Sequence, residues 1–261
     1  MKIIVLVKQV PNTSEIKIDK LTNTLIRKGV ESIINPDDLA GVEEALKLKS
    51  RYGGTVTCVT MGPFQAESMI RTLYGLGVDH AYLISDPKFA GSDTYATSTI
   101  LSSFLKTLEY DLIIAGYQAI DGDTAQVGPQ VAEMLELPQV GHLHAICGYQ
   151  DGVLQVERED ETEILTIDVR LPALVTTLRR MNTPRLMNAW DAFRATSKPF
   201  TLVRFGDFPV NELKIGLKGS PTQVSKTYTK VLVQKAPIEK VDAKEASKKI
   251  LALLYPYLGV K

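Results

Sequence analysis

The sequence predicts an α/β fold: a Rossmann-like parallel sheet flanked by helices, with an added antiparallel hairpin region and a C-terminal arm. Short apolar runs alternate with segments of helical spacing through about residue 137, and hairpin-like strands follow from about residue 145. The apolar runs lack the alternation of half-exposed strands, so we expect strands that are buried on both faces. Right-handed βαβ units are favoured by this order.

Four strand–helix pairs make up the first part of the chain. We expect strands at residues 3–7, 55–60, 81–84 and 112–115, and helices at residues 38–51, 64–74, 93–108 and 125–135. Asp37 or Asp38 is a candidate cap for the first helix, and Gly53 and Gly54 are expected to end it.

The later part of the chain predicts strands that join the same sheet. We expect them at residues 145–147, 153–157, 164–169 and 174–177, with a final helix at residues 243–254 that carries an apolar face. Residues 1–198 are therefore expected to form the Rossmann-like domain with its hairpin addition. Residues 199–261 are expected to form an extension that lies on a partner, because exposed apolar faces usually mark interfaces.

The composition excludes several classes of protein. Thirty basic residues balance thirty acidic ones, so no overall field favours nucleic acid, and no apolar run is long enough to span a membrane. Two distant cysteines indicate neither a disulfide framework nor a CxxC site. We expect a soluble, cytoplasmic protein. His142 and His144 would share one face of a strand, but no further ligands complete a metal site.

The segment from Gln118 to Gln130 is the most informative part of the chain. It follows an apolar strand, contains glycines and leads into a helix, an arrangement in which free amides hold an anionic phosphate. Pro129 is expected in the first helical turn, where it needs no amide hydrogen. The amides that this leaves free are those of Ala125, Gln126, Val127 and Gly128.

Three side chains in this loop have two possible roles. Asp121, Asp123 and Thr124 either cap the helix or meet the hydroxyls of a ribose. An ordinary capped helix after a β-turn is the alternative on spacing alone, and the Gly-Lys-Ser/Thr ending of a P-loop is missing. Loops at residues 8–11, 61–63 and 91–94 also follow predicted strands, so we expect all four loops to converge on one ligand.

Eight segments in a shared order resemble the β subunit of electron-transferring flavoprotein. They are VKQVP at residues 7–11, NPDD at 35–38, MGP at 61–63, GSDTYAT at 91–97, GYQAIDGDTAQVGP at 116–129, RLPA at 170–173, NTPR at 182–185 and GLKGSPT at 216–222. The resemblance covers nearly the whole chain. It implies a heterodimer with an α subunit that carries the electron-transferring FAD.

The resemblance also implies that this chain holds an adenine nucleotide of its own. In one branch of the family the nucleotide is AMP, and in the electron-bifurcating branch it is a second FAD that takes a hydride from NADH. Gly122 stands where the AMP branch usually carries an acidic residue, so the loop favours FAD, with AMP as the alternative. A more distant alternative is a nucleotide-hydrolysing α/β enzyme. No catalytic acid or base is identified.

The resemblance assigns the parts of the nucleotide to particular residues. The diphosphate is placed on the loop amides from Ala125 to Val127, with the hydroxyls of Thr94 and Thr97 nearby. The adenosine is placed against Val7, Lys8, Asn35 and Met61. A purely structural role in the turn that enters the helix is the alternative for Asn35 and Asp38. The complete set of expected cofactor-binding residues is Val7, Lys8, Asn35, Asp38, Met61, Gly62, Asp93, Thr94, Thr97, Gln118, Ala119, Asp121, Gly122, Asp123, Thr124, Ala125, Gln126, Val127 and Gly128.

The segment after Arg185 resembles the loop by which the family docks dehydrogenases of the acyl-CoA type or others. Ala189 occupies the position where a leucine anchor is expected, so the role passes to Leu186, Met187 or Trp190, since large aromatics are favoured anchors. The alternative is that Trp190 covers the core of its own chain. The bifurcating branch would also pass electrons to a low-potential acceptor such as ferredoxin or flavodoxin.

Overall fold

The computed structural model describes residues 1–12, 17–18, 25–26, 31–223 and 239–257. The chain divides into two compact units, Met1–Ser225 and Lys226–Lys261, and each is described by itself. Within these ranges no helix is both long enough and apolar enough to cross a membrane.

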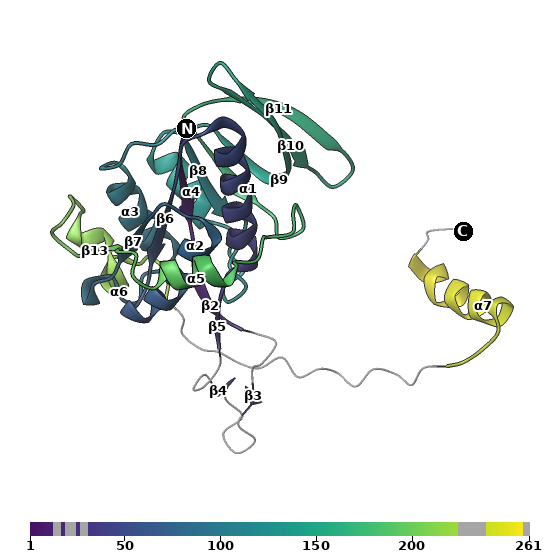
Figure 1. Cartoon of the computed structure of the whole chain (residues 1–261). Helices are drawn as coiled ribbons and strands as arrows, with labels where there is room; N and C mark the ends of the chain where they lie inside the picture. Colours follow the sequence, from purple (N-terminus) through teal and green to yellow (C-terminus); the bar gives the residue numbers. More distant parts are fainter. Residues whose placement is uncertain (13–16, 19–24, 27–30, 224–238, 258–261) are drawn as a thin grey trace. The chain divides into compact units, whose positions relative to one another are not determined.

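A nine-stranded sheet forms the centre of the first unit (Figure 1). Its strands run in the order β11 (Ile164–Arg170), β10 (Val153–Glu159), β9 (Gln139–Gln150), β12 (Ala173–Thr177), β8 (Leu112–Gly116), β1 (Lys2–Leu6), β6 (Thr55–Met61), β7 (His80–Ile84) and β13 (Thr201–Val203). Neighbours from β9 to β13 pair in parallel, whereas β10 pairs antiparallel with β9 and β11. The predicted fold class and the hairpin addition to the same sheet are confirmed.

The remaining elements are helices and two small strand pairs. The helices are α1 (Pro36–Tyr52), α2 (Glu67–Leu76), α3 (Thr94–Leu105), α4 (Val127–Met134), α5 (Ala189–Ala195), α6 (Gly216–Gly219) and, in the second unit, α7 (Ala243–Leu254). Short 3₁₀ turns are η2 (Phe64–Ala66), η3 (Pro87–Phe89), η4 (Glu212–Lys214) and η5 (Tyr255–Tyr257). β2 (Gln9–Pro11) pairs with β5 (Ser32–Ile34), and β3 (Lys17–Ile18) with β4 (Leu25–Ile26). These four short strands were not predicted.

Helices cover both faces of the sheet, which explains the uniformly apolar strands. Side chains of α1 and α2 form one buried cluster with the sheet, and side chains of α3 and α4 form a second. Ile113 and Ile114 of β8 are both fully buried, yet they belong to opposite clusters. Successive strand residues point to opposite faces, so every residue of such a strand must be apolar.

The chain reverses its direction across the sheet between β1 and β8. It proceeds from β1 to β6 and β7 on one side, and then α3 returns it to β8 on the other side of β1. In open α/β sheets this reversal separates the loops at the carboxyl ends of the two strands and leaves a crevice for a ligand. The fold therefore positions a site beside Val7, Lys8 and the segment after Gly116.

The first compact unit extends beyond the expected boundary at residue 198. Residues 201–203 form β13, which pairs with β7 at the edge of the sheet, and the unit continues to Ser225. The predicted helix at residues 243–254 is confirmed as α7. Residues 224–238 of the expected extension lie outside the described residues.

The ends of α1 agree only in part with the sequence analysis. Gly53 ends the helix with φ +73°, as expected for glycine in a region that disfavours side chains. The predicted cap by Asp37 or Asp38 is wrong, because α1 follows Asn35 without a side-chain cap. Both carboxylates accept hydrogen bonds from other segments instead.

Two helical glycines differ in what an added methyl group would meet. A Cβ at Gly41 of α1 would lie 2.9 Å from Ile114 Cγ2 and 3.0 Å from Thr177 Oγ1, which are buried in the sheet. A Cβ at Gly75 of α2 would meet the flexible end of Met187 at 2.8 Å.

We therefore expect Gly41→Ala to lower the free energy of unfolding by about 1–3 kcal/mol, since β-branched core residues cannot move aside. Gly75→Ala should leave stability unchanged or raise it by up to about 1 kcal/mol, because alanine favours the helix. Urea unfolding of the two variants measures the difference. Equal destabilisation by the two substitutions would contradict this difference, because the residues around Gly41 would then move aside as easily as Met187 does.

Candidate functional site

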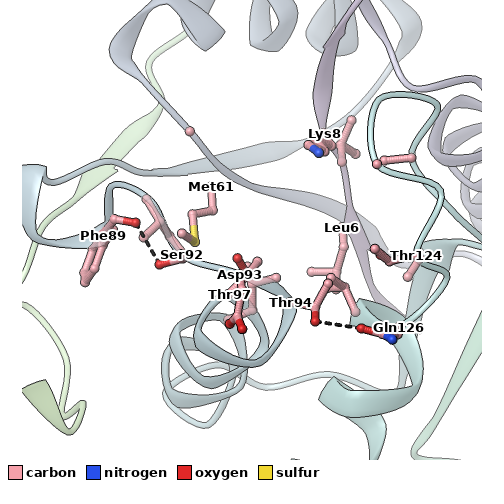
Figure 2. Close-up of a pocket in the computed structure, with 18 of the residues that line it drawn as sticks. Leu6, Lys8, Met61, Phe89, Ser92, Asp93, Thr94, Thr97, Thr124 and Gln126 are labelled. Atoms are coloured by element: carbon pink, nitrogen blue, oxygen red, sulfur yellow. Dashed lines mark hydrogen bonds between the residues drawn. The ribbon is translucent and has the colours of Figure 1, made fainter. Parts of the chain in front are cut away.

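A cavity of about 720 Å³ lies at the carboxyl ends of β1, β6, β7 and β8 (Figure 2). Residues from all four of the predicted loops line it, so the loops converge on one cavity. Its volume is within the range of about 300–1,000 Å³ that small-molecule sites occupy. Of the predicted binding residues, those that line the cavity are Val7, Lys8, Asp38, Met61, Gly62, Asp93, Thr94, Thr97, Gln118, Ala119, Gly122, Thr124, Ala125, Gln126, Val127 and Gly128. Asn35, Asp121 and Asp123 lie outside the lining.

Sequence reasoning missed two further parts of the lining. Leu6, Val59 and Ile84 provide apolar surface from inside the strands, and residues 85–87, 89 and 90 come from the segment directly after β7. The second group could have been found, because the loop after β7 begins at Ser85 and not at Gly91 where we started it. The strand residues carry no such signal, since their sequence fits a core equally well.

The loop before α4 adopts an unusual backbone conformation. Asp123 and Ala125 have φ values of +49° and +53°, a region that residues other than glycine seldom adopt. Gln126 follows with φ −105° and ψ −31°, so residues of opposite hand alternate. This alternation turns successive amides towards a common concavity, called a nest, which binds anions.

The amides of this nest are available for a ligand. Within the described part of the chain, the backbone N–H groups of Ala125, Gln126, Val127 and Gly128 make no hydrogen bond. Pro129 is the third residue of α4, as predicted, and the positive end of the helix dipole adds to the attraction for an anion. Four aligned donors beside a cavity fit an anionic ligand.

Capping of α4 was one of the two roles considered for three side chains of this loop, and it does not occur. Gln126 precedes α4 without a side-chain cap, so Asp121, Asp123 and Thr124 leave its first amides unoccupied. The Asp121 carboxylate instead accepts two hydrogen bonds from Lys8 Nζ, at 2.7 and 2.8 Å. This ion pair joins the loop after β1 to the loop after β8.

The start of α3 lies beside the nest but is already capped. The Asp93 carboxylate accepts from Ala96 N at 3.0 Å and from Thr222 N and Oγ1 at 3.0 and 2.7 Å. Burial acts to raise the pKa of Asp93, but these hydrogen bonds outweigh it and lower the pKa. Thr94 Oγ1 donates to Gln126 Oε1 at 2.7 Å, which connects α3 to the nest (Figure 2).

Asn35 and Asp38 hold the cavity loops in place. The Asp38 carboxylate accepts from Lys8 N at 2.7 Å and from Gly116 N at 3.1 Å. Lys8 lies two residues beyond β1, and Gly116 is the last residue of the neighbouring strand β8. Asn35 Nδ2 donates to Gln118 O at 2.8 Å, and Asn35 Oδ1 accepts from Ile120 N at 3.2 Å. Both residues therefore have a structural role, but they connect loops and do not cap the start of α1.

The segment predicted to dock a partner forms an exposed apolar patch. Leu186, Met187, Trp190 and Phe193 have exposed fractions of 94%, 42%, 66% and 69%, and the rings of Trp190 and Phe193 stack at 6.2 Å. Trp190 therefore does not cover the core of its own chain. Ala189, the first residue of α5, is exposed beside it.

An ion pair fixes the start of this patch to α1. Arg185 Nε and Nη2 donate to the two oxygens of Glu43, at 2.9 and 3.2 Å, and Arg185 N donates to Glu43 at 3.0 Å. Such a two-pronged contact restrains both position and orientation.

The histidines show no sign of a metal site. Among the described residues, no group of three His, Cys, Asp or Glu side chains could hold a metal ion. The His142 ring packs on Tyr117 at 4.4 Å, and His144 Nδ1 lies 3.8 Å from Glu159. The φ of +57° at His142 breaks the alternation that would have put both rings on one face.

The fold and the cavity define a Rossmann-like α/β protein with a ligand site at its topological switch point. Comparison with known proteins narrows the class: residues 22–202 match the family described as the electron transfer flavoprotein domain. The electron transfer flavoprotein subunit beta of Thermoanaerobacterium thermosaccharolyticum is 46% identical over 230 residues, covering 88% of each chain.

Two further relatives of similar identity have other names. The caffeyl-CoA reductase-Etf complex subunit CarD of Acetobacterium woodii is 44% identical over 231 residues, covering 88% of each chain. Protein FixA of Azotobacter vinelandii is 44% identical over 237 residues, covering 87% of this chain and 84% of the relative. This chain belongs to the electron transfer flavoprotein family, and the predicted resemblance to its β subunits is confirmed.

Asp38 gives the site a pH dependence. Burial raises the pKa of this carboxyl to about 7, although hydrogen bonds from Asn35, Lys8 N and Gly116 N oppose the shift. The unfolded value is about 3.9, so between about pH 4 and pH 7 the folded chain binds the proton more strongly. The contribution of Asp38 to stability is therefore complete at low pH and is lost as the pH rises through this window.

We expect the free energy of unfolding of the wild-type chain, relative to that of Asp38→Asn, to fall by at most about 4 kcal/mol from pH 4 to pH 7. Urea unfolding at a series of pH values measures this difference, and the groups common to both proteins cancel. A difference that grows with pH would mean that the folded state favours the ionised carboxylate.

Proposed function

We propose that this chain is the β subunit of a heterodimeric, electron-bifurcating flavoprotein and that its cavity binds an FAD of its own. In this proposal the FAD takes a hydride from NADH, and its electrons pass to a dehydrogenase and to a low-potential acceptor such as ferredoxin or flavodoxin. The observation that carries the proposal is the nest of free amides from Ala125 to Val127 beside a cavity of about 720 Å³.

The residues present fit the diphosphate of such a cofactor. Neutral, aligned amide donors suit a diphosphate, and Gly122 has no atom within 4 Å of where a Cβ would lie, so the loop stays open there. Thr97 lines the cavity near the nest and offers a hydroxyl donor, whereas the hydroxyl of Thr94 already donates to Gln126. The adenosine is assigned to Val7, Lys8 and Met61, which line the same cavity. Asn35 supports that end by holding the loop.

The chain's own residues bind, orient and shield the cofactor. A bound flavin supplies hydride acceptance and one-electron transfer, while the protein sets its position and surroundings. The amides of α4 hold the anionic part, and the apolar side chains of Leu6, Val59 and Ile84 exclude water from the cavity floor. The ion pair of Lys8 with Asp121 ties together the two loops that flank the ligand.

AMP is the alternative ligand, because the same amides could hold a single phosphate. The cavity favours FAD, since it continues past the nest to residues 85–87, 89 and 90 after β7 and offers room beyond one mononucleotide. No observation favours the more distant alternative of a nucleotide-hydrolysing enzyme, and membership of the family argues against it.

Separate surfaces are proposed for the two protein partners. The patch of Leu186, Met187, Trp190 and Phe193 is proposed to dock a dehydrogenase or reductase of the acyl-CoA type, consistent with relatives named for caffeyl-CoA and acryloyl-CoA reductases. Residues 199–261 are proposed to contact the α subunit. In the second unit, α7 exposes Ile250, Leu251, Leu253 and Leu254, as an arm laid on a partner requires.

The purified heterodimer should contain about two FAD molecules per pair of subunits, one of them in this chain. Denaturation followed by chromatography of the released cofactors counts them, after incubation with FAD to replace any that is lost during purification. One FAD together with stoichiometric AMP would assign this chain to the AMP-binding branch.

Substitutions at Ala125 test the nest directly. Ala125→Pro removes one amide and forces φ to about −65°, so we expect it to lose the nucleotide of this chain. Ala125→Gly keeps the amide and tolerates φ +53°, so it should retain the nucleotide and be slightly more stable. Cofactor content and thermal unfolding are measured for both. Retention of the nucleotide by the proline variant, with the fold intact, would exclude binding at these amides.

A further inference from the structure

Helix α5 carries part of the exposed apolar patch but gains little stability of its own. It has seven residues, whereas isolated helices shorter than about 12–15 residues are marginal in water. The structure describes all seven, and Ala195 is the one that is buried, while Trp190 and Phe193 are exposed. Packing of a buried face, which stabilises most helices in proteins, is therefore small here. Contacts with other elements must hold α5 in place.

The start of α5 is held by its own cap and by α1. Asn188 Oδ1 accepts from Asp191 N at 2.8 Å, and Asn188 Nδ2 donates to Asp191 Oδ2 at 2.6 Å. These two bonds close the first turn of the helix but reach no other element. Shortly before this cap, Arg185 pairs with Glu43 of α1. The chain that enters the patch is therefore fixed before the helix begins.

Arg71 of α2 holds the other end of α5. Its Nη1 donates to Ala195 O at 3.3 Å and also to Lys198 O. Its Nη2 donates to Glu67 Oε1 at 2.7 Å, one turn earlier in α2. The last carbonyl groups of a helix lack donors within the helix, and Ala195 O otherwise receives one long bond, from Lys198 N at 3.4 Å. A cation at this end also interacts favourably with the helix dipole.

Arg71 differs from its neighbours because it reaches α5 itself. Among the described residues, it is the one side chain outside residues 185–200 that donates a hydrogen bond to this helix. The segment after α5 also lies on α2, beside which Figure 1 shows α5. Tyr74 OH donates to Pro199 O at 2.6 Å, and the Arg71 guanidinium lies 5.4 Å from the centre of the Phe200 ring. One face of α2 thus supports the whole end of the segment.

We propose that Arg71 is a positioning residue for partner docking: it holds α5 folded against α2, so that Trp190 and Phe193 meet the partner in a fixed arrangement. The inference rests on the proposed docking of an acyl-CoA-type dehydrogenase and deepens it, because it names the group that presents the docking patch. Arg71 is not part of the patch, and it acts through the carbonyl groups that it binds. A preformed patch spares the cost of ordering the segment when the two proteins associate.

Trp190 reports directly on α5, because it is the single tryptophan of the chain. Time-resolved fluorescence anisotropy is measured on the heterodimer, and the Trp190→Phe heterodimer provides the background from other tryptophans. Arg71→Met keeps the apolar stem and removes the donors. We expect the amplitude of the nanosecond decay of Trp190 anisotropy to rise about twofold in Arg71→Met, since segments without an anchor move on this timescale.

Electron transfer to an acyl-CoA-type dehydrogenase of the source organism provides a second readout. In Arg71→Met we expect the KM for the dehydrogenase to rise about five- to tenfold, with kcat at saturating dehydrogenase within about twofold of wild type. Arg71 does not line the cavity, so the nucleotide content should be unchanged. A variant that only weakened the fold would lose nucleotide and kcat instead.

Tyr74→Phe is a second variant that changes less. It keeps the ring and removes the hydrogen bond to Pro199 O, whose residue is exposed and can bind water instead. Both readouts should change in the same direction as in Arg71→Met, with a rise in KM of about twofold. This variant keeps the inference testable should Arg71→Met fail to fold.

Two further variants serve as matched controls. Glu67→Gln removes the charge beside Arg71 but keeps an oxygen that accepts its hydrogen bond. Arg51→Met removes another helical guanidinium that donates to a carbonyl group, that of Cys147 at 3.5 Å, and has no printed role at α5. Both controls should stay within about twofold of wild type in both readouts, because exposed polar contacts contribute little.

The possible outcomes separate the positioning role from the docking surface. An unchanged Trp190 anisotropy in a folded Arg71→Met variant overturns the positioning role and leaves the patch standing as the docking surface. An equal rise in KM in Arg51→Met also overturns it. If Trp190→Ala leaves the KM for the dehydrogenase unchanged, the patch is not the docking surface, and the proposed role of Arg71 in docking falls with it.

Discussion

Two buried aspartates at the start of α1 hold the carboxyl ends of three neighbouring strands together. Asp38 accepts from Lys8 N and Gly116 N, and Asp37 accepts from Arg179 N at 2.8 Å and Gln118 N at 3.3 Å. These amides follow or end β1, β8 and β12. Burying a carboxylate is costly unless it is hydrogen-bonded, and here the strand-end amides are the partners. The positions of the loops after β1 and β8, which line the cavity, depend on this arrangement.

The nest depends on the same arrangement. Asp123 and Ala125 adopt positive φ values that cost about 1 kcal/mol or more each, so neighbouring contacts must hold them. Asn35 binds Gln118 O and Ile120 N, Lys8 binds Asp121, and Thr94 binds Gln126. Contacts therefore anchor the loop before and after the strained residues. Because these donors are already held in place, little conformational free energy is needed to order the loop when a ligand binds.

Helix α1 also connects the cavity with the exposed apolar patch. Its first turn carries Asp38, and Glu43 a little over one turn later holds Arg185 at the beginning of the patch. The Arg185 contact opposes the effect of burial and lowers the pKa of Glu43, so the ion pair persists near neutral pH. One rigid helix thus sets the distance between the proposed flavin site and the proposed docking surface, a distance on which electron transfer depends.

The sequence alone determined the order of the main strands and helices, the parallel sheet and the location of the nest. These follow from local patterns: apolar runs, glycines, and Pro129 in a first turn. The sequence did not determine β13 or the four short strands β2 to β5, because three or fewer residues carry no periodic signal. It offered Asp121 and Asp38 as candidate caps or ligand-binding residues, whereas their partners are Lys8, 113 positions away in sequence, and two strand ends. Only the tertiary structure decides such pairings, since a carboxylate bonds whichever donors the fold brings to it.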